Sequence, residues 1–516
     1  MLFTNAFIVF LISGCFVYYY FTRTFKYWQS RNIPGPKPLP FFGNIKDFVF
    51  RKSNAAKLNK QFYDEYPNTK VVGIYRLTSP TLIIRDLDVI KKVLIKDFNY
   101  FDDRGMELGK EGLGANLFNA NSDIWRPLRN IFSPLFTTGK LKNMIQLITE
   151  RSDKFMDYVK KITEANPDQE VYSLIQKFTM SSIVACAFGL NISVDNNSFL
   201  GKLIKIDRLS FARNIAQDLD LIYPGVLKKL NASFFTKQLS IFFLGLVSDI
   251  MTARNGVPSD RKDFIDLILE LKNQGNIVDT NKTEDGVNAI EGVSLTNDVI
   301  AAQAFIFYAA GYETNASTLA YMMYELARNP QIQEKLIAEV DEVLDRHNGK
   351  ITYEMITSEL PYMDKVLNET LRKYPVADLQ RRANTNYNIP GTDITIEKGT
   401  IIFVPTLGIN YDEKYFPNPT KFDPERFSPE NESKRHSCAF TPFGAGPRYC
   451  IGMLFAKIQS RVCLMKLLSN FRVETSMSTP TTIEIDPQRI VSAPKGGIHL
   501  NLITRKSRNG SLTKDK

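Results

Sequence analysis

The first feature of the hydrophobic pattern is an uncharged apolar run over residues 1–22, which ends close to three consecutive tyrosines. As a helix this run would be roughly 33 Å long, enough to cross a bilayer core of about 30 Å. No lysine or arginine precedes it, whereas Arg23, Lys26 and Arg31 follow it. We therefore expect a transmembrane signal-anchor at 1–22, with the rest of the chain on the cytosolic side. The alternative, a cleaved signal peptide, lacks a basic start and a clear cleavage site.

The segment that follows, residues 23–45, is basic and rich in proline. Four prolines fall within residues 34–40, and prolines at this density oppose helix and favour a stiff, extended chain. We expect a hinge here, between the anchor and the body of the protein. At the opposite end, residues 506–516 form a polar tail that we expect to be disordered.

Between residues 46 and 505, helical periodicity alternates with shorter strand-like runs. Helical patterns are clearest over 262–272, 296–328, 331–344 and 363–374. Residues 71–84 predict a β-hairpin that turns at 78–80, and residues 394–404 predict a second that turns at 398–399. The pattern therefore predicts a mainly α fold with small β-sheets.

Composition and charge narrow the class of protein. The chain has 516 residues, of which 44% are hydrophobic and 23% charged, so it can bury a sizeable core. Its five cysteines have no paired spacing, which fits a reducing compartment and disfavours a disulfide framework. With only three histidines, a histidine-rich metal site is not expected. The net charge of +10 is spread along the chain, which suits phospholipid or an acidic protein better than nucleic acid.

The strongest chemical signal is the sequence FGAGPRYCIG at residues 443–452. It places Cys450 in a glycine-rich loop, two residues after Arg448, and a thiolate persists at neutral pH only near positive charge or a metal. The glycines, Gly452 among them, allow backbone to pass close to a flat ligand, and Phe443 can shield the sulfur from water. A shielded thiolate beside a planar cofactor is how cysteine serves as an axial ligand of haem iron. The alternative is a buried structural cysteine in an ordinary turn.

This pattern, F-x-x-G-x-R-x-C-x-G, resembles the haem-binding signature of the cytochrome P-450 superfamily. Short stretches such as 101–105 and 389–392 are similar to insect microsomal members of the detoxification type. The resemblance implies the fold of that superfamily, with residues 46–505 as a haem-binding catalytic domain. It also implies haem b held non-covalently apart from the bond between the Cys450 thiolate and the iron. The expected location is the endoplasmic reticulum membrane, with the catalytic domain facing the cytosol.

A second motif, Glu313-Thr314, lies midway along the helix predicted over 296–328. On the residues alone, a threonine that bonds to the carbonyl one turn earlier is the commoner event. The resemblance implies an oxygen-activation motif in which Thr314 and Glu313 manage protons. Asn315 stands where the family usually has threonine or serine, which leaves the details of the proton network open. Gly311 costs about 1 kcal/mol relative to alanine in a helix, so we expect something to approach the backbone there.

Further family motifs assign structural and cofactor-binding roles. Glu369 and Arg372 share one helical face, and such a pair taken alone means little. The resemblance implies that both form a buried ion network with Arg426. Trp125 and Arg129 lie one turn apart, and on the residues alone would be a core tryptophan and a surface arginine. The resemblance implies contact with a haem propionate, which two further arginines would pair through their bidentate forks, namely Arg448 and Arg381.

The function implied is a monooxygenase that inserts one oxygen atom from dioxygen into lipophilic substrates, either xenobiotics or endogenous lipids and steroids. Electrons would come from NADPH through a flavin-containing reductase, with a cytochrome b-type protein as an alternative donor. Membrane lipid is a further expected partner, and nucleic acid is not. The basic residues expected to face the electron donor are Arg126, Lys140, Lys142 and Lys457. The residues expected to line the substrate pocket are Leu117, Phe118, Phe305, Ala309 and Ala310, with parts of segments 101–121 and 376–380.

Three other functions remain open from the sequence. A haem-thiolate isomerase or dehydratase would act on a hydroperoxide without a reductase, although Glu313-Thr314 argues against it. A membrane-anchored haem-binding sensor or carrier would show no turnover. A cysteine hydrolase built on Cys450 and His436 lacks any hydrolase motif around the cysteine.

Overall fold

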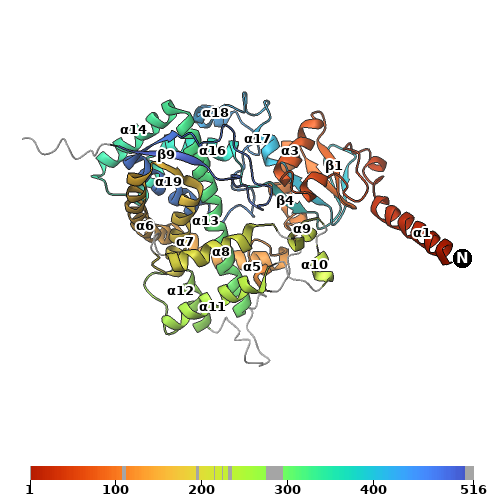
Figure 1. Cartoon of the computed structure of the whole chain (residues 1–516), viewed down its shortest axis with the longest axis horizontal. Coiled ribbons are helices and arrows are strands. Elements are labelled where there is room, and N and C mark those ends of the chain that lie inside the picture. The colour runs from red at the N-terminus through yellow and green to blue at the C-terminus, as the bar shows by residue number, and fades with distance from the viewer. Residues whose placement is uncertain are drawn as a thin grey trace, which may run out of the picture.

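The computed structural model describes residues 2–106, 112–192, 197–213, 215–222, 225–230, 235–274 and 295–505, so the predicted polar tail lies outside the described residues. Helices dominate the fold, and the long α13 runs through its centre (Figure 1). In the N-terminal half the helices are α1 (Leu2–Thr22), α2 (Lys46–Val49), α3 (Ala55–Glu65), α4 (Leu87–Lys91), α5 (Ser122–Phe132), α6 (Thr138–Ala165), α7 (Val171–Phe188), α8 (Asn197–Phe211), α9 (Ile215–Ile222), α10 (Val226–Lys229) and α11 (Lys237–Ala253).

The C-terminal half carries the helices that position the candidate site. They are α12 (Phe264–Asn273), α13 (Asn297–Arg328), α14 (Pro330–Arg346), α15 (Tyr353–Ser358), α16 (Pro361–Lys373), α17 (Thr406–Asn410), α18 (Pro429–Ser433) and α19 (Met453–Asn470). Short helical turns occur at η1 (Gln29–Arg31), η2 (Lys92–Lys96), η3 (Phe98–Tyr100), η4 (Gly112–Gly114), η5 (Ser133–Phe136) and η6 (Pro424–Phe427).

The predicted helices are confirmed to within a few residues at each end. Helix α13 begins where the sequence indicated, because the side chain of Thr296 accepts a hydrogen bond from the backbone N–H of Val299 and so caps the helix. Helices α14 and α16 both begin with a proline, Pro330 and Pro361 respectively. Proline suits the first helical position because its missing N–H would be unpaired there in any case.

The largest sheet has four strands in the order β1-β2-β7-β4. The first predicted hairpin is present as β1 (Val71–Arg76) and β2 (Ser79–Ile84), which pair antiparallel. Its turn is earlier than predicted, at Leu77 and Thr78, and Pro80 lies within the strand opposite Tyr75. Strand β7 (Ile401–Val404) pairs parallel to β2 and antiparallel to β4 (Leu379–Arg382).

The second predicted hairpin is wrong. Strand β6 (Thr395–Ile396) pairs with the preceding β5 (Tyr387–Asn388), while β7 leaves to join the four-stranded sheet. The chain diverges because Gly399 donates a backbone hydrogen bond to Ala383, directly after β4, which carries β7 to β4. Alternating residues indicate a strand but do not say which strand it pairs with. The third sheet, β3-β9-β8, is antiparallel and is formed by β3 (Asp168–Glu170), β8 (Phe471–Thr475) and β9 (His499–Thr504).

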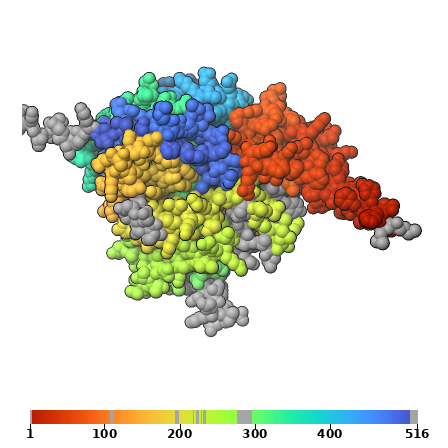
Figure 2. All heavy atoms as spheres, viewed as in Figure 1, coloured from red at the N-terminus to blue at the C-terminus, as the bar shows by residue number. Residues whose placement is uncertain are grey.

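The two largest hydrophobic cores hold most of the molecule together. The larger lies among the helices around α13, and the smaller lies between the four-stranded sheet and the segment 28–33. Two of the described helices, α1 and α7, are long and apolar enough to cross a membrane. Helix α7 is almost entirely buried in the larger core, so its apolar character reflects its place in the fold. Helix α1 is exposed along its length and projects away from the body (Figures 1 and 2).

The predicted hinge packs against the four-stranded sheet. The Trp28 side chain is 3% exposed, and its indole N–H donates to the backbone oxygen of Ile74 at 2.9 Å. The backbone oxygen of Pro34 accepts a hydrogen bond from Gly73 at 2.8 Å. The composition of residues 23–45 suggested an extended arm, but the buried aromatic and the backbone bonds attach this segment to the body of the protein.

Candidate functional site

The loop that carries Cys450 touches both cores. Phe443 and Ile451 pack against the helical core, while Ala445 packs against the sheet core. The loop is closed by a hydrogen bond from the Cys450 N–H to the Phe443 oxygen at 2.8 Å. Helix α19 begins immediately afterwards, with Gly452 as its N-cap residue. The cysteine is therefore held at the boundary between the two halves of the fold, just before a helix N-terminus.

Opposing influences act on the Cys450 thiol. Its side chain keeps accessible surface, but the surrounding protein desolvates it and raises its pKa. The backbone N–H of Gly452 and the charges of Arg129 and Arg104 act in the opposite direction. The N-terminus of α19 adds a partial positive charge next to the sulfur. The loop thus supplies the electrostatic support that a metal-bound thiolate needs, while burial keeps the free thiol protonated.

One glycine of this loop is required by a close approach of two backbone segments. Gly446 has φ of +69°, and a Cβ there would lie 1.8 Å from the backbone oxygen of Leu94. The backbone of the loop therefore approaches the backbone of η2 closely at Gly446. Any side chain at position 446 would force the Cys450 loop away from this contact, in addition to straining the backbone.

Two buried arginines and one half-buried arginine surround the cysteine loop, and none of the three forms an ion pair with a carboxylate among the described residues. Arg381 and Arg448 are each 2% exposed, and Arg448 donates to the backbone oxygen of Ala120 at 2.6 Å. The Nε of both residues, and Nη1 of Arg448, are buried without a hydrogen-bond partner. Arg104 donates to the backbone oxygen of Phe118 at 2.7 Å and approaches that of Arg448 at 3.5 Å.

Charge crowding and burial are visible in the pKa of each arginine. Burial lowers the pKa of Arg381 to about 10. Burial and the charge of Arg381 lower that of Arg448 to about 9. Burial and the neighbouring arginines also place the pKa of Arg104 well below its ordinary value. A cluster of buried cations with unpaired donors is stable only when an anion neutralises it. The two propionates of a haem fit this requirement, since arginine binds carboxylates bidentately.

Trp125 and Arg129 lie on α5 beside this cluster. The Trp125 side chain is 5% exposed, and the Arg448 guanidinium lies over its ring at 4.6 Å. Arg129 donates to the backbone oxygen of Tyr449 at 3.1 Å and stacks on the Tyr449 ring. The structure therefore brings Trp125, Arg129 and Arg448 together next to Cys450. These residues and the unpaired arginine donors fit a haem whose iron is bound by the cysteine.

We predict that Arg104→Met weakens haem retention. Loss of one charged hydrogen bond to a propionate should cost about 1.5–3 kcal/mol, or roughly 10- to 150-fold in affinity. The measurement is the rate at which the purified holoprotein gives up haem to an excess of apomyoglobin. Arg126→Met is the matched control, because Arg126 lies on α5 with an exposed side chain. Equal rates for both variants would remove Arg104 from the haem site.

Helix α13 is mostly buried, but the face that carries Thr314 remains accessible to solvent or a ligand. Thr314 is half-buried and Ala310 exposed, whereas Ala309 and Tyr312 beside them are buried. The Thr314 hydroxyl donates to the Ala310 oxygen at 2.9 Å, the local bond that threonine commonly makes in a helix. This bond leaves the oxygen lone pairs of the hydroxyl available to a ligand or water on the accessible side.

Glu313 points away from this accessible face. Its side chain is 0% exposed, and its carboxylate accepts hydrogen bonds from Tyr172 at 2.6 Å and from Gln176 at 2.8 Å, both on α7. Arg489 donates to the same carboxylate at 2.9 Å. No hydrogen bond joins Glu313 to Thr314 among the described residues, so the predicted pair is adjacent in sequence but divided between two sides of the helix.

Gly311 and Asn315 serve helix packing. A Cβ at Gly311 would lie 2.7 Å from Cδ1 of Ile183, so the close neighbour expected at this glycine is helix α7. The Asn315 amide bonds to the Gln459 side chain and to the backbone oxygen of Ala456, both on α19. The residue that departs from the family pattern thus ties α13 to the helix that follows Cys450 and keeps the Thr314 face close to the cysteine loop.

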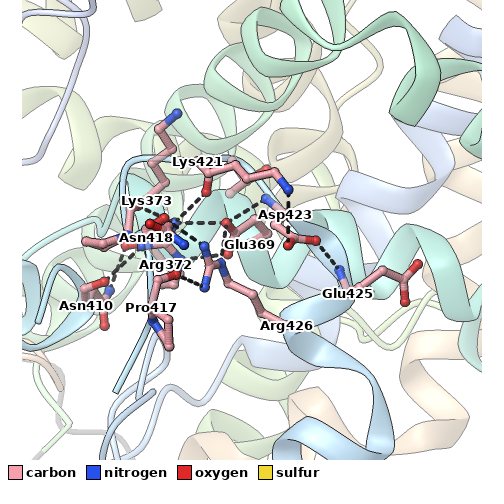
Figure 3. A network of polar contacts seen from close by, with 12 residues as sticks. Glu369, Arg372, Lys373, Asn410, Pro417, Asn418, Lys421, Asp423, Glu425 and Arg426 are labelled. Atoms are coloured by element: carbon pink, nitrogen blue, oxygen red, sulfur yellow. Dashed lines mark hydrogen bonds and ion pairs between the residues drawn. The ribbon is translucent and has the colours of Figure 1, made fainter. Parts of the chain in front are cut away.

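The predicted ion network is assembled at the end of α16 (Figure 3). Arg372 and Glu369 are both fully buried, and they form two hydrogen bonds, at 2.6 Å and 2.8 Å. Arg426 approaches Glu369 at 3.4 Å, and the backbone N–H of Asp423 donates to the same carboxylate at 2.9 Å. Arg372 also donates to the backbone oxygen of Asn410, whose amide donates back to the Arg372 oxygen at 2.8 Å. The network fastens α16 to the long loop that leads to Cys450.

The predicted substrate-pocket residues separate into two groups. Phe118 and Ala310 have exposed surface, and the Arg104 guanidinium lies over the Phe118 ring at 4.2 Å. Leu117, Phe305 and Ala309 are buried. The Phe305 ring packs against two phenylalanine rings between 235 and 243, which places it in the helical core. In the two predicted lining segments, Ala377 is exposed, while residues 107–111 lie outside the described residues.

The four basic residues proposed to face an electron donor differ in accessibility. Arg126 and Lys142 are exposed, and each lies within ion-pair distance of a carboxylate. Lys140 donates to a backbone oxygen at 3.2 Å. Lys457 is largely surrounded by protein, and this burial lowers its pKa. Arg126, Lys140 and Lys142 are therefore better placed than Lys457 to meet a partner.

Sequence reasoning missed three residues of the site. Arg104 lies in the stretch 101–105, which the sequence marked only for its family resemblance. An arginine that follows two aspartates gives no sign of contact with a cofactor. Asp207 and Arg489 lie more than a hundred residues before and after Glu313 in the sequence. In the fold, Nη2 of Arg489 is 2.7 Å from Oδ1 of Asp207 and 2.9 Å from Oε1 of Glu313. No local motif marks them, so only the fold reveals their contact.

Comparison with known proteins agrees with this geometry. The model of the family described as Cytochrome P450 matches residues 33–501 of the chain. Cytochrome P450 6B1 of Papilio polyxenes is 54% identical over 95% of this chain and 97% of its own length. Cytochrome P450 6B2 of Helicoverpa armigera is 49% identical over 95% and 96%. Probable cytochrome P450 6a18 of Drosophila melanogaster is 36% identical over 94% and 96%. The matched region contains every residue of the candidate site described above.

Proposed function

We propose that this chain, which belongs to the cytochrome P450 family, is a membrane-anchored monooxygenase that resembles the insect cytochromes P450 6B. The observation that carries the proposal is Cys450 directly before α19, beside Arg104 and beside the unpaired buried donors of Arg381 and Arg448. The family binds haem b through a cysteine thiolate, and these residues would hold the iron and the propionates. The reaction consumes dioxygen, two electrons and two protons, places one oxygen atom in the substrate and releases the other as water.

Haem, when bound, supplies the oxygen and electron chemistry, and the thiolate ligand increases electron density at the iron in favour of O–O cleavage. The protein supplies binding, orientation and protons. Arg104, Arg381 and Arg448, with Trp125 and Arg129, would fix the position of the porphyrin. The buried Glu369–Arg372–Arg426 network would keep the loop that precedes Cys450 in place. We assign this network a structural role because Glu369 and Arg372 are fully buried and their bonds go to each other and to the loop that follows α17.

Thr314 would hold a proton donor on the accessible face of α13. Its hydroxyl is anchored to the Ala310 oxygen at 2.9 Å, which orients its lone pairs toward the internal space. Glu313 would feed protons from the opposite side of the helix, after leaving its buried partners. Proton transfer from Glu313 to the Thr314 side requires the Glu313 side chain to rotate, because its present hydrogen bonds all point away from Thr314.

We predict that Thr314→Ala uncouples NADPH oxidation from product formation. Without the hydroxyl, the ratio of NADPH consumed to product formed should rise by roughly 3- to 10-fold, at the low end of what a positioned proton relay contributes. The measurement is a parallel count of NADPH, product and hydrogen peroxide in the reconstituted enzyme. Thr314→Ser retains the hydroxyl and should restore coupling. An unchanged ratio in Thr314→Ala would exclude Thr314 from proton delivery.

The substrate is proposed to be lipophilic. Among the described residues predicted to line the pocket, the exposed ones are Phe118, Ala310 and Ala377, which are apolar. They offer burial to an apolar molecule without a charged group to bind a polar one. The exposed apolar helix α1 would anchor the protein in the endoplasmic reticulum membrane, with the catalytic body on the cytosolic side, so such a substrate would reach the enzyme from lipid.

Electrons are proposed to come from an NADPH-cytochrome reductase, with a cytochrome b-type protein as an alternative donor. The support is the basic set on and near α5 and α6, in particular Arg126, Lys140 and Lys142. Attraction between these cations and an acidic partner speeds encounter and weakens with added salt.

The experiment that tests the proposed function is reconstitution with NADPH, reductase and a panel of lipophilic substrates under ¹⁸O₂. Product that carries one ¹⁸O atom and depends on both NADPH and reductase would support the monooxygenase. Rearrangement of a hydroperoxide without NADPH would favour the isomerase or dehydratase instead. Bound haem without any conversion across the panel would favour a sensor or carrier.

A further inference from the structure

One arginine is shared by two buried carboxylates behind the accessible face of α13. Arg489 Nη2 lies 2.7 Å from Oδ1 of Asp207 and 2.9 Å from Oε1 of Glu313. Its Nη1 makes a second bond to Asp207, at 3.1 Å. Asp207 therefore holds the guanidinium in a bidentate pair, whereas Glu313 receives a single hydrogen bond from it.

Within the part of the chain that the structure describes, the surroundings of this cluster offer no further cation. Glu313 is faced by Tyr172 and Gln176 from α7, by Arg489 from the segment before β9 and by Asp207 from α8. Three buried tyrosines on its own helix also lie close enough for the charge of Glu313 to raise their pKa, namely Tyr308, Tyr312 and Tyr321. Among the described residues, no lysine or second arginine pairs with either carboxylate. The cluster carries one positive charge against two negative ones when both acids are ionised.

An uncompensated negative charge is costly in a buried site, so the cluster favours binding of a proton. Burial raises the pKa of the Glu313 carboxyl, Arg489 opposes the rise, and the charge of Asp207 adds to it. Asp207 has the stronger hold on the arginine, and the Tyr312 hydroxyl supports it at 2.7 Å. The added proton therefore belongs on Glu313, the carboxyl with the weaker claim on Arg489.

We propose that Asp207 is a positioning residue for proton delivery: by occupying Arg489, it leaves the Glu313 carboxyl able to carry a proton. Without Asp207, Glu313 would take the whole guanidinium and stay ionised against it. Release of Glu313 would then require separation of a buried ion pair, which is far more costly than breaking hydrogen bonds of a neutral acid. This inference rests on the proposed function only for the use of the proton, since the sharing of Arg489 is a property of the fold.

The test replaces Asp207 with asparagine, which keeps the shape and removes the charge. In the holoprotein, infrared spectroscopy across a pH series reports the protonated carboxyl band, which is assigned to Glu313 by its absence in Glu313→Gln. We expect the midpoint of this band in Asp207→Asn to fall by about one pH unit or more. Product per NADPH should fall by about 2- to 10-fold, because a one-unit drop leaves roughly a tenth of the protonated form at neutral pH.

A double-substitution cycle separates this role from a merely structural one. If Asp207 acts through Glu313, Asp207→Asn combined with Glu313→Gln should couple no worse than Glu313→Gln alone. Asp207→Glu, which restores the charge, should recover both the band midpoint and the coupling. The matched control is Asp218→Asn, because Asp218 pairs with Arg51 and Arg213 and does not touch Glu313.

The outcomes distinguish the inference from the proposed function. An unchanged band midpoint in Asp207→Asn, or additive losses in the double variant, would overturn the role of Asp207 while wild-type turnover remained intact. If Asp207→Asn does not fold, the band in Asp207→Glu and its loss in Glu313→Gln still decide whether Glu313 binds a proton, and a wild-type protein without that band would refute the proposal. Failure of the wild type to oxidise any substrate would refute the proposed function alone.

Discussion

Replacement of Cys450 by alanine is expected to abolish turnover and to change the spectrum of any haem that remains. Cys450 is the only cysteine of the FGAGPRYCIG loop, and it lies directly before the N-terminus of α19. Changes to residues that merely orient a metal ligand cost about 10- to 100-fold, so loss of the ligand itself should exceed ~100-fold. The measurement is reductase-dependent oxidation, normalised to haem content, together with the absorption spectrum.

A matched control shows that the effect belongs to the ligand and not to loss of any cysteine. Cys463 lies on helix α19, which begins directly after the Cys450 loop, is 1% exposed, and burial raises the pKa of its thiol. Cys463→Ala should keep the haem spectrum and the turnover and lose only packing energy. Wild-type oxidation in Cys450→Ala, at full haem content, would refute the assignment of Cys450 as the iron ligand.

The second large effect is expected from Glu369→Gln, which leaves Arg372 buried without its counter-ion. Both side chains are 0% exposed and share two hydrogen bonds. Removing one partner of a fully buried ion pair typically costs roughly 3–5 kcal/mol. The free energy of unfolding, measured in urea by far-ultraviolet circular dichroism, should fall by this amount, and haem should be lost more readily because the loop leading to Cys450 is no longer fastened to α16.

The control for this prediction is an exposed ion pair in the same region. Lys335 and Glu425 lie 2.6 Å apart, with side chains 57% and 48% exposed. Lys335→Met should change the free energy of unfolding by about 0–1 kcal/mol, as is usual for surface pairs. If Glu369→Gln is no more destabilising than Lys335→Met, the network does not support the cysteine loop and our structural assignment is incorrect.

Local signals predicted the helices well because their causes are local. Helix α13 begins at a threonine cap and ends at Asn329-Pro330, and all of this information lies within the segment itself. The second hairpin was wrong because strand pairing is a non-local choice: β7 joins β2, which lies more than three hundred residues earlier in the chain, through the register Thr81 with Ile401. Alternation of residue types carries no information about such a partner.

The candidate site shows the same division. Cys450, Glu369 and Arg372 lie in motifs whose spacing marks them, and the structure places them in a common region. The direction of a side chain was not predictable in the same way: Glu313 and Thr314 are neighbours in sequence, but successive helical residues are about 100° apart, so they face different sides. The purpose of Gly446 was also hidden, because its requirement comes from the backbone of Leu94, which approaches from a different element.

Residues that act through buried charge were the hardest to find. Arg104, Asp207 and Arg489 stand in unremarkable sequence, and ordinary charged residues of this kind are mostly exposed. Each gains its role from burial together with a distant partner, which depends on how α8, α13 and the C-terminal segment pack. Buried charged residues with unpaired donors or shared partners are therefore the functional candidates that the structure reveals and the sequence motifs do not.

The absorption spectrum of the reduced protein with carbon monoxide is the most direct test of the central claim that Cys450 binds haem iron as a thiolate. The full-length protein in detergent, or the body without α1, should give a strongly red-shifted Soret band, as expected for a carbon monoxide complex opposite a thiolate. Folded protein with the band at the ordinary position for histidine-ligated haem would mean that Cys450 is not the ligand, and the proposed oxygen chemistry would fail with it.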